Sequence, residues 1–123
     1  MLCKLHIENY ALIHELKLDF TLGLTVVTGE TGSGKSILLG ALGLALGDRA
    51  TTSSVRHGAT QCVVEATFKS ENLSKDLESW EITPNADNHI YIRREVTSTG
   101  RSKAFVNDSQ TSVTTLKEIG SLL

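Results

Sequence analysis

Hydrophobic and polar positions alternate along the first twenty residues of the chain. The alternation is clear in "LHIE" (5–8) and returns in "ELKLDF" (15–20). Because successive side chains of a strand point to opposite faces, both segments are predicted to be half-buried β-strands. After a turn at residues 22–23, "LTVVT" (24–28) has β-branched residues without alternation, which is typical of a strand covered on both faces.

A helix that is apolar on nearly every side is predicted next, beginning near Gly34 and ending at Gly47. Its core, "ILLGALGLALG" (37–47), has only about half of the roughly 20 residues that a membrane span requires. This helix is therefore expected to lie inside a globular core. The Ser- and Thr-rich segment 48–60 is expected to be a loop.

The second half of the chain again has strand-like alternation, interrupted by one amphipathic segment. The predicted elements are a strand at 62–69, a short helix at 70–80, a turn at 84–88, and a hairpin of strands 89–96 and 102–108 around "TSTG". Trp80 is expected to be a core anchor beneath the short helix, and not a platform for a nucleobase.

The last ten residues are predicted to form a helix. Thr115 and Glu118 have the spacing of a capping box, and Leu116, Ile119 and Leu123 form an apolar stripe. Because the stripe runs to the last residue without a cap, the chain is expected to be a fragment.

Composition narrows the possible functions. With 123 residues, one domain spanning 1–123 is expected, and the net charge of -2 gives no overall basic field for nucleic acid. Cys3 and Cys62 lie far apart and the four histidines are scattered, so neither a disulfide nor a metal site is expected. The N-terminus lacks the pattern of a secretory signal, so a cytoplasmic protein is expected.

One motif carries chemistry. The segment "GETGSGKS" satisfies G-x-x-x-x-G-K-[ST], and it stands between the expected buried strand and the expected apolar helix, which is the context this phosphate-binding motif requires. Its residues, the candidate cofactor-binding set, are Gly29, Glu30, Thr31, Gly32, Ser33, Gly34, Lys35 and Ser36.

Each residue type of this motif has a physical role. Glycines let the backbone curl so that its N–H groups point at phosphate oxygens, and the helix N-terminus adds its positive dipole end. Lys35 can bring a cation to the β- and γ-phosphates, and the Ser36 hydroxyl can ligate Mg²⁺. A glycine-rich turn that merely packs tightly would explain the glycines but not the adjacent lysine and hydroxyl.

The same motif serves ATP and GTP, and no base-reading N-K-x-D sequence is present. Hydrolysis also needs an acidic residue at the end of a second apolar strand. The nearest approach, "VVEA" (63–66), lacks both the length and the acidic pair. The chain is therefore expected to bind a nucleotide but not to hydrolyse it unaided, and no catalytic residue is assigned.

A second candidate site lies on the predicted hairpin, where four cations gather: Arg93, Arg94, Arg101 and Lys103. Arg101 and Lys103 are the candidate DNA contacts, through phosphates. The alternative for this cluster is cross-strand ion pairing, because alternation places Arg93 and Glu95 on the same strand face.

Several segments, taken in order, resemble the N-terminal part of the RecN family of bacterial DNA repair proteins. They are "ENYALIHELKLDF", "GLTVVTGETGSGKSILLGALGLALGDRA", "VRHGA", "VEATF", "IRREVTSTGRSKAFVND" and "LKEIGSLL". That family is similar to SMC and Rad50 proteins, whose ABC-type ATPase heads are split by a coiled coil. The resemblance implies an α/β P-loop NTPase fold: the N-terminal lobe of such a head, with an antiparallel β layer beside a mixed sheet.

The resemblance also implies function. Residues Gly29 to Ser36 match the family's Walker A loop, which favours ATP with Mg²⁺ as the ligand. The expected partners are DNA, the C-terminal lobe of the same protein, and a second head in an ATP-bound homodimer, with double-strand-break repair at the nucleoid as the role. No membrane partner is implied.

The resemblance leaves three points open. The hairpin tip (97–103) resembles a basic loop near DNA or nucleotide in SMC-like heads. Either Arg49 or Arg56 could correspond to an arginine that reaches nucleotide phosphate in such heads, or both could be solvated loop residues. Two alternatives to a RecN-like head remain: a RecF- or Rad50-type head, and a non-catalytic dimerisation or docking module.

Overall fold

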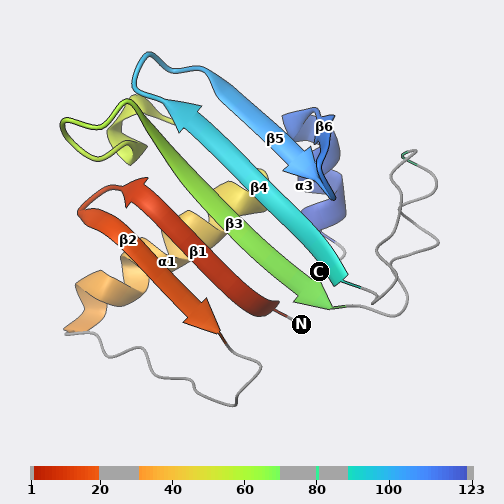
Figure 1. Ribbon diagram of the computed structural model, residues 1–123, viewed down its shortest axis with the longest axis horizontal. Coiled ribbons are helices and arrows are strands. Elements are labelled where there is room, and N and C mark those ends of the chain that lie inside the picture. Colours follow the sequence, from red (N-terminus) through yellow and green to blue (C-terminus); the bar gives the residue numbers. More distant parts are fainter. Residues whose placement is uncertain (1, 20–30, 70–79, 81–88, 122–123) are drawn as a thin grey trace.

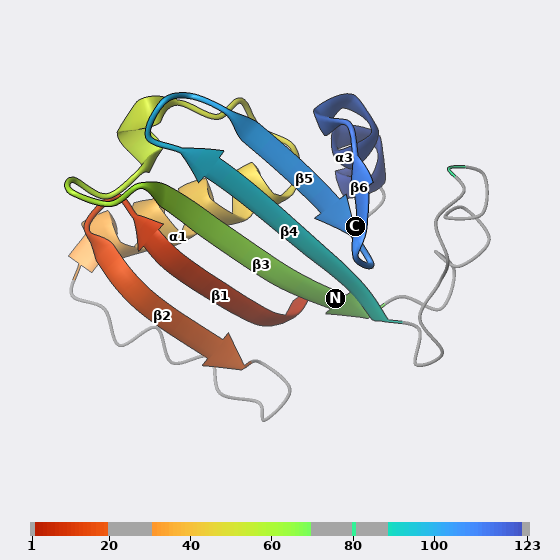
Figure 2. The same cartoon turned by 45° about the horizontal axis from the view of Figure 1, so that its top comes forward.

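One antiparallel β-sheet with helices on one face forms the described part of the chain (Figure 1). The computed structural model describes residues 2–19, 31–69, 80 and 89–121. The sheet has six strands in the order β2-β1-β3-β4-β5-β6, and every neighbouring pair is antiparallel. Figure 2 shows α1 and α3 on the same side of this sheet, and residues of both belong to one hydrophobic core.

The N-terminal hairpin confirms the predicted alternation. It consists of β1 (Leu2–Tyr10) and β2 (Ile13–Asp19), in which Leu5 pairs with Leu18 and Ile7 pairs with Leu16. The side chains of these four residues point at the helices. The alternate residues lie on the opposite face of the sheet, over which the structure describes no second layer.

The second hairpin also forms, but its second strand ends at Val106, two residues before the predicted end. β3 (Gln61–Lys69) pairs with β1 and with β4 (His89–Thr97), and β4 pairs with β5 (Ser102–Val106). A further short strand, β6 (Ser109–Thr111), follows a turn at Asn107 and Asp108, both of which have positive φ. The sequence did not predict β6, because three polar residues carry no hydrophobic pattern.

The long helix α1 (Thr31–Ala45) packs beneath β1, β3 and β4. It begins three residues before the predicted start, because the apolar run that marked it contains no information about the short polar residues that precede it. It ends at Ala45, two residues before the predicted end. Gly47, with φ 105°, follows the last turn in the left-handed conformation that glycine favours after a helix. The loop after it contains a 3₁₀ turn, η1 (Thr52–Ser54), and an isolated antiparallel bridge between Val55 and Tyr10.

The C-terminal helix α3 (Val113–Gly120) buries Leu116 and Ile119 in the core, as the predicted stripe requires. The predicted capping box is wrong. Ser112 is the N-cap, and its hydroxyl accepts a hydrogen bond from the Thr115 N–H at 3.1 Å. A serine has the same capping chemistry as a threonine, and this one stands three residues earlier.

Trp80 packs against the core, as expected, and its indole N–H donates to the Glu118 carboxylate at 3.1 Å. The rest of the predicted helix 70–80, the turn at 84–88, the turn at 22–23 and the strand 24–28 lie outside the described residues, as does Leu123 of the predicted stripe. The mixed sheet that strand 24–28 would begin is therefore not described. No described helix is long and apolar enough to cross a membrane.

Candidate functional site

The predicted phosphate-binding motif coincides with the start of α1. Thr31 to Ser36 form the first turns of the helix, while Gly29 and Glu30 lie outside the described residues. The first turn of an α-helix has backbone N–H groups without intrahelical partners, so this helix end can accept an anion. The side chains of the motif, including those of Lys35 and Ser36, are not described.

The body of α1 is fixed by burial against the sheet. Ala41, Leu44 and Ala45 are 0%, 3% and 0% exposed, and they belong to the same core as the inward-facing residues of β1, β3 and β4. An apolar helix anchored in this way cannot slide or turn without breaking core packing. The position of its N-terminus, and so of the motif, therefore depends on these contacts.

A buried arginine anchors the other end of α1. Arg94 is 1% exposed, and its Nη1 donates to the carbonyl oxygens of Leu44 at 3.0 Å and Asp48 at 3.1 Å. Its Nε donates to the hydroxyl of Ser102 at 2.7 Å. These bonds join the C-terminal end of α1 to β4 and β5. Burial lowers the pKa of Arg94, because the charged guanidinium loses hydration, although the Cys62 thiol and the Asp48 carboxyl oppose that shift.

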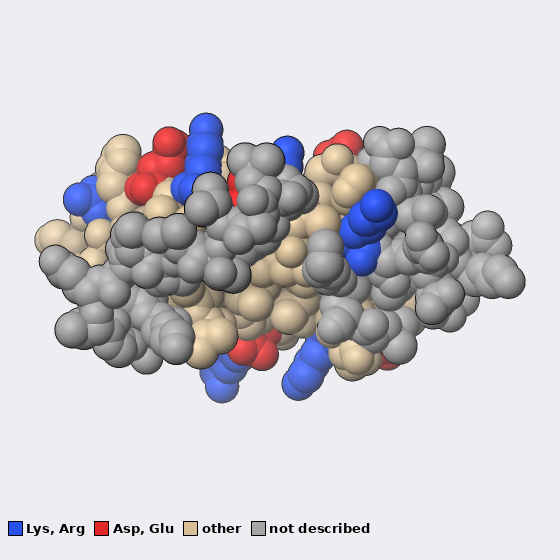
Figure 3. Space-filling view, turned by 90° about the horizontal axis from the view of Figure 1, so that it is seen from below, with Lys and Arg blue, Asp and Glu red and all other residues tan. Residues whose placement is uncertain are grey.

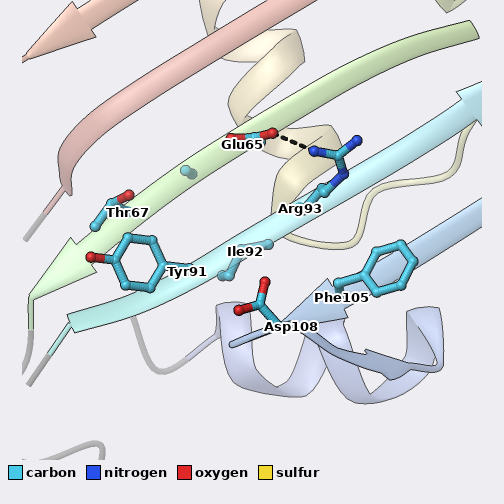
Figure 4. A pocket seen from close by; sticks show the side chains of 8 residues that line it. Glu65, Thr67, Tyr91, Ile92, Arg93, Phe105 and Asp108 are labelled. Atoms are coloured by element: carbon cyan, nitrogen blue, oxygen red, sulfur yellow. Dashed lines mark hydrogen bonds and ion pairs between the residues drawn. The ribbon is translucent and has the colours of Figure 1, made fainter. Parts of the chain in front are cut away.

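The neighbouring arginine has the opposite environment (Figure 4). The Arg93 Nη1 lies 2.6 Å from the Glu65 carboxylate and its Nε lies 2.7 Å from that of Glu95. The hydrogen bond to Glu95 is the main cause of a raised Arg93 pKa, with Glu65 contributing further. The ion-pairing alternative for Arg93 is therefore confirmed.

A cavity of about 300 Å³ opens beside Arg93 on the face of the sheet away from the helices. Tyr91 and Phe105 form part of its lining, and the Asp108 carboxylate faces it from the turn before β6 (Figure 4). Because the only described cation in the lining is already neutralised by Glu65 and Glu95, this cavity has no free positive charge for a phosphate.

The hairpin tip presents the other two predicted cations. Arg101 and Lys103 are exposed, and within the described residues neither forms an ion pair. The tip is a well-defined turn: the Thr97 N–H donates to the Arg101 carbonyl at 2.8 Å, and the Thr97 hydroxyl accepts from the Arg101 N–H at 3.0 Å. The structure therefore separates the predicted four-residue cluster into two surface cations, one ion-paired arginine and one buried arginine.

The two loop arginines lie in different places. Arg49 is exposed beside the C-terminal end of α1 and lines a cavity with Arg94. Arg56 is half-buried, and its backbone N–H donates to the Asn9 carbonyl at 2.8 Å, next to the turn between β1 and β2.

The described residues form no wide basic patch on the face shown in Figure 3. The Lys and Arg side chains drawn there stand singly or beside acidic side chains. This agrees with the net charge of -2 and means that any contact of this described surface with a polyanion is local.

Sequence reasoning missed the structural role of Arg94. The signal was present in the alternation of β4, because Ile90, Ile92, Arg94 and Val96 occupy every second position and all four are buried. An arginine in phase with three apolar residues belongs to the buried face. Counting it with Arg93, its neighbour in sequence, placed it on the wrong side of the sheet.

Comparison with known proteins places the chain among ATPase domains. The family described as AAA domain matches residues 4–122. The DNA repair protein RecN of Vibrio cholerae is 44% identical over 126 residues, and RecN of Haemophilus influenzae is 40% identical over 127 residues. Both alignments cover 100% of this chain but only 22% and 23% of the relatives, so the chain spans about a fifth of their length.

Solved structures with the same fold include heads of SMC proteins and RecF. The Smc head domain of Pyrococcus yayanosii, with a coiled coil and joint, has a TM-score of 0.76 at 20% identity and matches 98% of this chain and 25% of its own. The recombination mediator RecF with ATP has a TM-score of 0.65 at 19% identity and matches 90% of this chain and 27% of its own. At this identity the likeness shows the fold, and it confirms the predicted α/β lobe of an ABC-type ATPase head. The chain belongs to the AAA domain family, and the resemblance to RecN that its sequence indicates is confirmed.

Proposed function

We propose that this chain is the ATP-binding lobe of a RecN-like DNA repair ATPase, with the phosphates held by Gly29 to Ser36. The observation that carries the proposal is that α1 begins inside the motif, while its body is fixed in the core beneath the sheet. A motif that only formed a tight turn would not need a lysine and a hydroxyl in the first turns of a helix whose body packs against the core. The solved structure of RecF with ATP has the same fold.

In this proposal each part of the motif has a separate task. Backbone N–H groups of the first turn and of the glycines bind phosphate oxygens, and the Lys35 ammonium provides a positive charge beside them. The Ser36 hydroxyl would ligate Mg²⁺, which, when bound, neutralises charge on the β- and γ-phosphates. The fit rests on the donor chemistry of the motif and on the helix N-terminus that contains it.

Nucleotide hydrolysis is proposed for the whole protein and not for this chain alone. The sequence contains no run of four apolar residues followed by an Asp-Glu pair to complete a magnesium site. The C-terminal lobe of the same protein and a second head would supply the missing groups, so that ATP binding drives head-to-head pairing. The RecN relatives are DNA repair proteins, and we propose the same role, repair of double-strand breaks at the nucleoid, for the protein that contains this lobe.

The hairpin tip is the proposed DNA contact of this lobe. Arg101 and Lys103 are exposed and free of ion pairs among the described residues, whereas Arg93 is neutralised and Arg94 is buried. Alanine at both Arg101 and Lys103 should weaken DNA binding by the full-length protein and lower its dependence on salt, because two phosphate contacts would be lost. Unchanged affinity and unchanged salt slope, measured by fluorescence anisotropy, would rule out this contact.

The nucleotide site is tested by Lys35→Ala. The variant should lose at least about tenfold in Mg²⁺–ATP affinity, because a charge-assisted contact to phosphate is removed. Calorimetric titration of the chain and of the full-length protein, side by side, measures this loss. Lys17→Ala removes an exposed strand lysine instead and is the control. Equal affinity in Lys35→Ala and the control, with both folded by circular dichroism, would contradict the proposal.

A further inference from the structure

A second cavity, of about 540 Å³, lies at the end of α1 opposite to the phosphate-binding motif. Its walls come from four parts of the chain: the segment after α1, the strand β4, the tip of the β4–β5 hairpin and the first turns of α3. Since α1 has 15 residues and rises about 1.5 Å per residue, the two ends of the helix are roughly 22 Å apart. A ligand in this cavity would therefore occupy a site separate from the proposed nucleotide site.

The charges around this cavity are all of one sign. Arg49, Arg94 and Lys117 contribute to its lining, and no described acidic residue does. Arg49 and Lys117 are exposed, and no ion pair joins either of them to a carboxylate within the part of the chain that the structure describes. Three cations from three different elements thus converge without a counter-ion, in contrast to the cavity beside Arg93.

The buried Arg94 has no anionic hydrogen-bond partner among the described residues. All the hydrogen-bond acceptors that Arg94 has in the structure are neutral: two backbone carbonyls and the Ser102 hydroxyl. A buried charge is normally balanced by an opposite charge, because removing it from water is costly. The Asp48 carboxyl acts on Arg94 only at a distance and does not line the cavity. An anion in the cavity would supply the missing partner.

Neutral donors are also in place. The Ser102 oxygen accepts from the Arg94 Nε at 2.7 Å, so its own O–H remains available to donate to another acceptor. Thr114, in the first turn of α3, adds a second hydroxyl to the lining. Cations combined with hydroxyl donors and no carboxylate match a group with several anionic oxygens.

We propose that this cavity binds a phosphate group, with Arg49 and Lys117 as the exposed cations that receive it and Arg94 as the buried charge behind them. The phosphate could belong to a nucleic acid backbone or to a free phosphate compound, since both present the same oxygens. The proposal stands apart from the nucleotide site, because none of the cavity residues belongs to the motif at Gly29 to Ser36.

The test compares cavity and control variants of the full-length protein in a Lys35→Ala background, which removes phosphate binding at the motif. The cavity variant is Arg49→Ala/Lys117→Ala. The control is Lys4→Ala/Lys17→Ala, which removes two exposed lysines on the opposite face of the sheet. None of these side chains is buried, so all variants should fold.

Inorganic phosphate, added against chloride at equal ionic strength, is the first probe, and the rise in melting temperature is the readout. The parent and the control should be stabilised by phosphate, whereas the cavity variant should need at least about tenfold more phosphate for the same rise. Lys117→Arg alone should respond like the parent, because it keeps the charge. An equal response of the cavity variant and the parent would overturn the proposal, as would an equal loss in the control.

A fluorescein-labelled single-stranded oligonucleotide is the second probe, read by anisotropy. If the natural phosphate belongs to nucleic acid, the cavity variant should bind the strand more weakly, and the slope of log affinity against log salt should become shallower by about 1.4. If the phosphate belongs to a small compound, strand binding should equal that of the control while the response to inorganic phosphate is still lost.

Discussion

Arg93 and Arg94 are adjacent in sequence, yet they lie on opposite faces of β4 and have opposite environments. The Arg93 side chain is 43% exposed and bonded to two carboxylates, whereas Arg94 is 1% exposed and bonded only to neutral acceptors. Accordingly, the pKa of Arg93 is raised and that of Arg94 is lowered. The difference shows that the side of the sheet, and not the residue type, decides whether an arginine serves as a surface partner or as a structural anchor.

The largest expected effect is the loss of the buried anchor. Arg94→Ala should destabilise the protein by about 3 kcal/mol or more, because it removes the charged donor to the Asp48 carbonyl and the Ser102 hydroxyl and leaves the Leu44 carbonyl with only the Gly47 N–H. Arg93→Ala should cost about 1 kcal/mol or less, because exposed ion pairs contribute little. The midpoints of urea unfolding measure both. Similar losses for the two variants would remove the distinction drawn between them.

A smaller loss of stability is expected at Gly47, where the backbone after α1 approaches α3 closely. Gly47 has φ 105°, and an added Cβ would lie 2.8 Å from the backbone of Lys117. Gly47→Ala should therefore cost about 2 to 3 kcal/mol, from conformational strain and from the clash with α3.

Gly58 is the matched control for this prediction, because it has φ 87° with no atom within 4 Å of an added Cβ. Gly58→Ala should cost about 1 kcal/mol, from strain alone. Thermal unfolding compares the two variants. A loss in Gly58→Ala as large as that in Gly47→Ala would show that the close approach to α3 is unimportant.

The coupling energy of each arginine with one of its partners gives a finer comparison of the two environments. A double-mutant cycle of Arg94 and Ser102 should give a coupling energy of about 1 to 2 kcal/mol, because the hydrogen bond between them has a buried, charged donor. The matching cycle of Arg93 and Glu65 should give about 0.2 to 1 kcal/mol and should fall with added salt. If both couplings respond equally to salt, then Arg94 is not shielded from solvent as the structure indicates.

The smallest effect concerns pH. Burial raises the pKa of the Cys62 thiol above its ordinary value of 9.0, although backbone hydrogen bonds and Arg94 oppose the shift. As the pH rises past that ordinary value, the unfolded chain loses its thiol proton before the folded chain does. The stabilisation present below pH 9.0 is therefore lost progressively above it.

Urea unfolding at several pH values tests the contribution of Cys62. The fall in unfolding free energy between neutral pH and the alkaline range should be smaller in Cys62→Ala than in the natural chain. Tyr10, whose pKa is also raised by burial, leaves a residual fall in the variant. An identical fall in both proteins would show that the buried thiol does not contribute.

Most of the strands could be predicted because each has one buried and one exposed face. The alternation of Leu5 and Ile7 with polar residues, and of Val64 and Ala66 with Glu65 and Thr67, is a direct consequence of strand geometry. The strand β6 and the N-cap at Ser112 were not predicted, because short polar segments carry no periodicity and several hydroxyl residues compete for the same cap.

The candidate nucleotide site was predictable for a different reason. The motif of Gly29 to Ser36 is contiguous, so its spacing can be recognised without knowledge of the fold, and the structure adds only that α1 begins within it. The cavity of Arg49, Arg94 and Lys117 was not predictable. Its three cations are up to 68 positions apart, between Arg49 and Lys117, and only chain folding brings them together.

The sequence by itself determined most of the local features of this protein: five of the six described strands, the apolar body of the long helix and the glycine that follows it. Those features depend on neighbours along the chain, through side-chain alternation, helix termini and glycine conformations. Only the tertiary structure decided the environment of each charged side chain. Whether a cation is paired, buried or left facing a cavity depends on which distant carboxylates and carbonyls folding places beside it, and that placement is not encoded in any short segment.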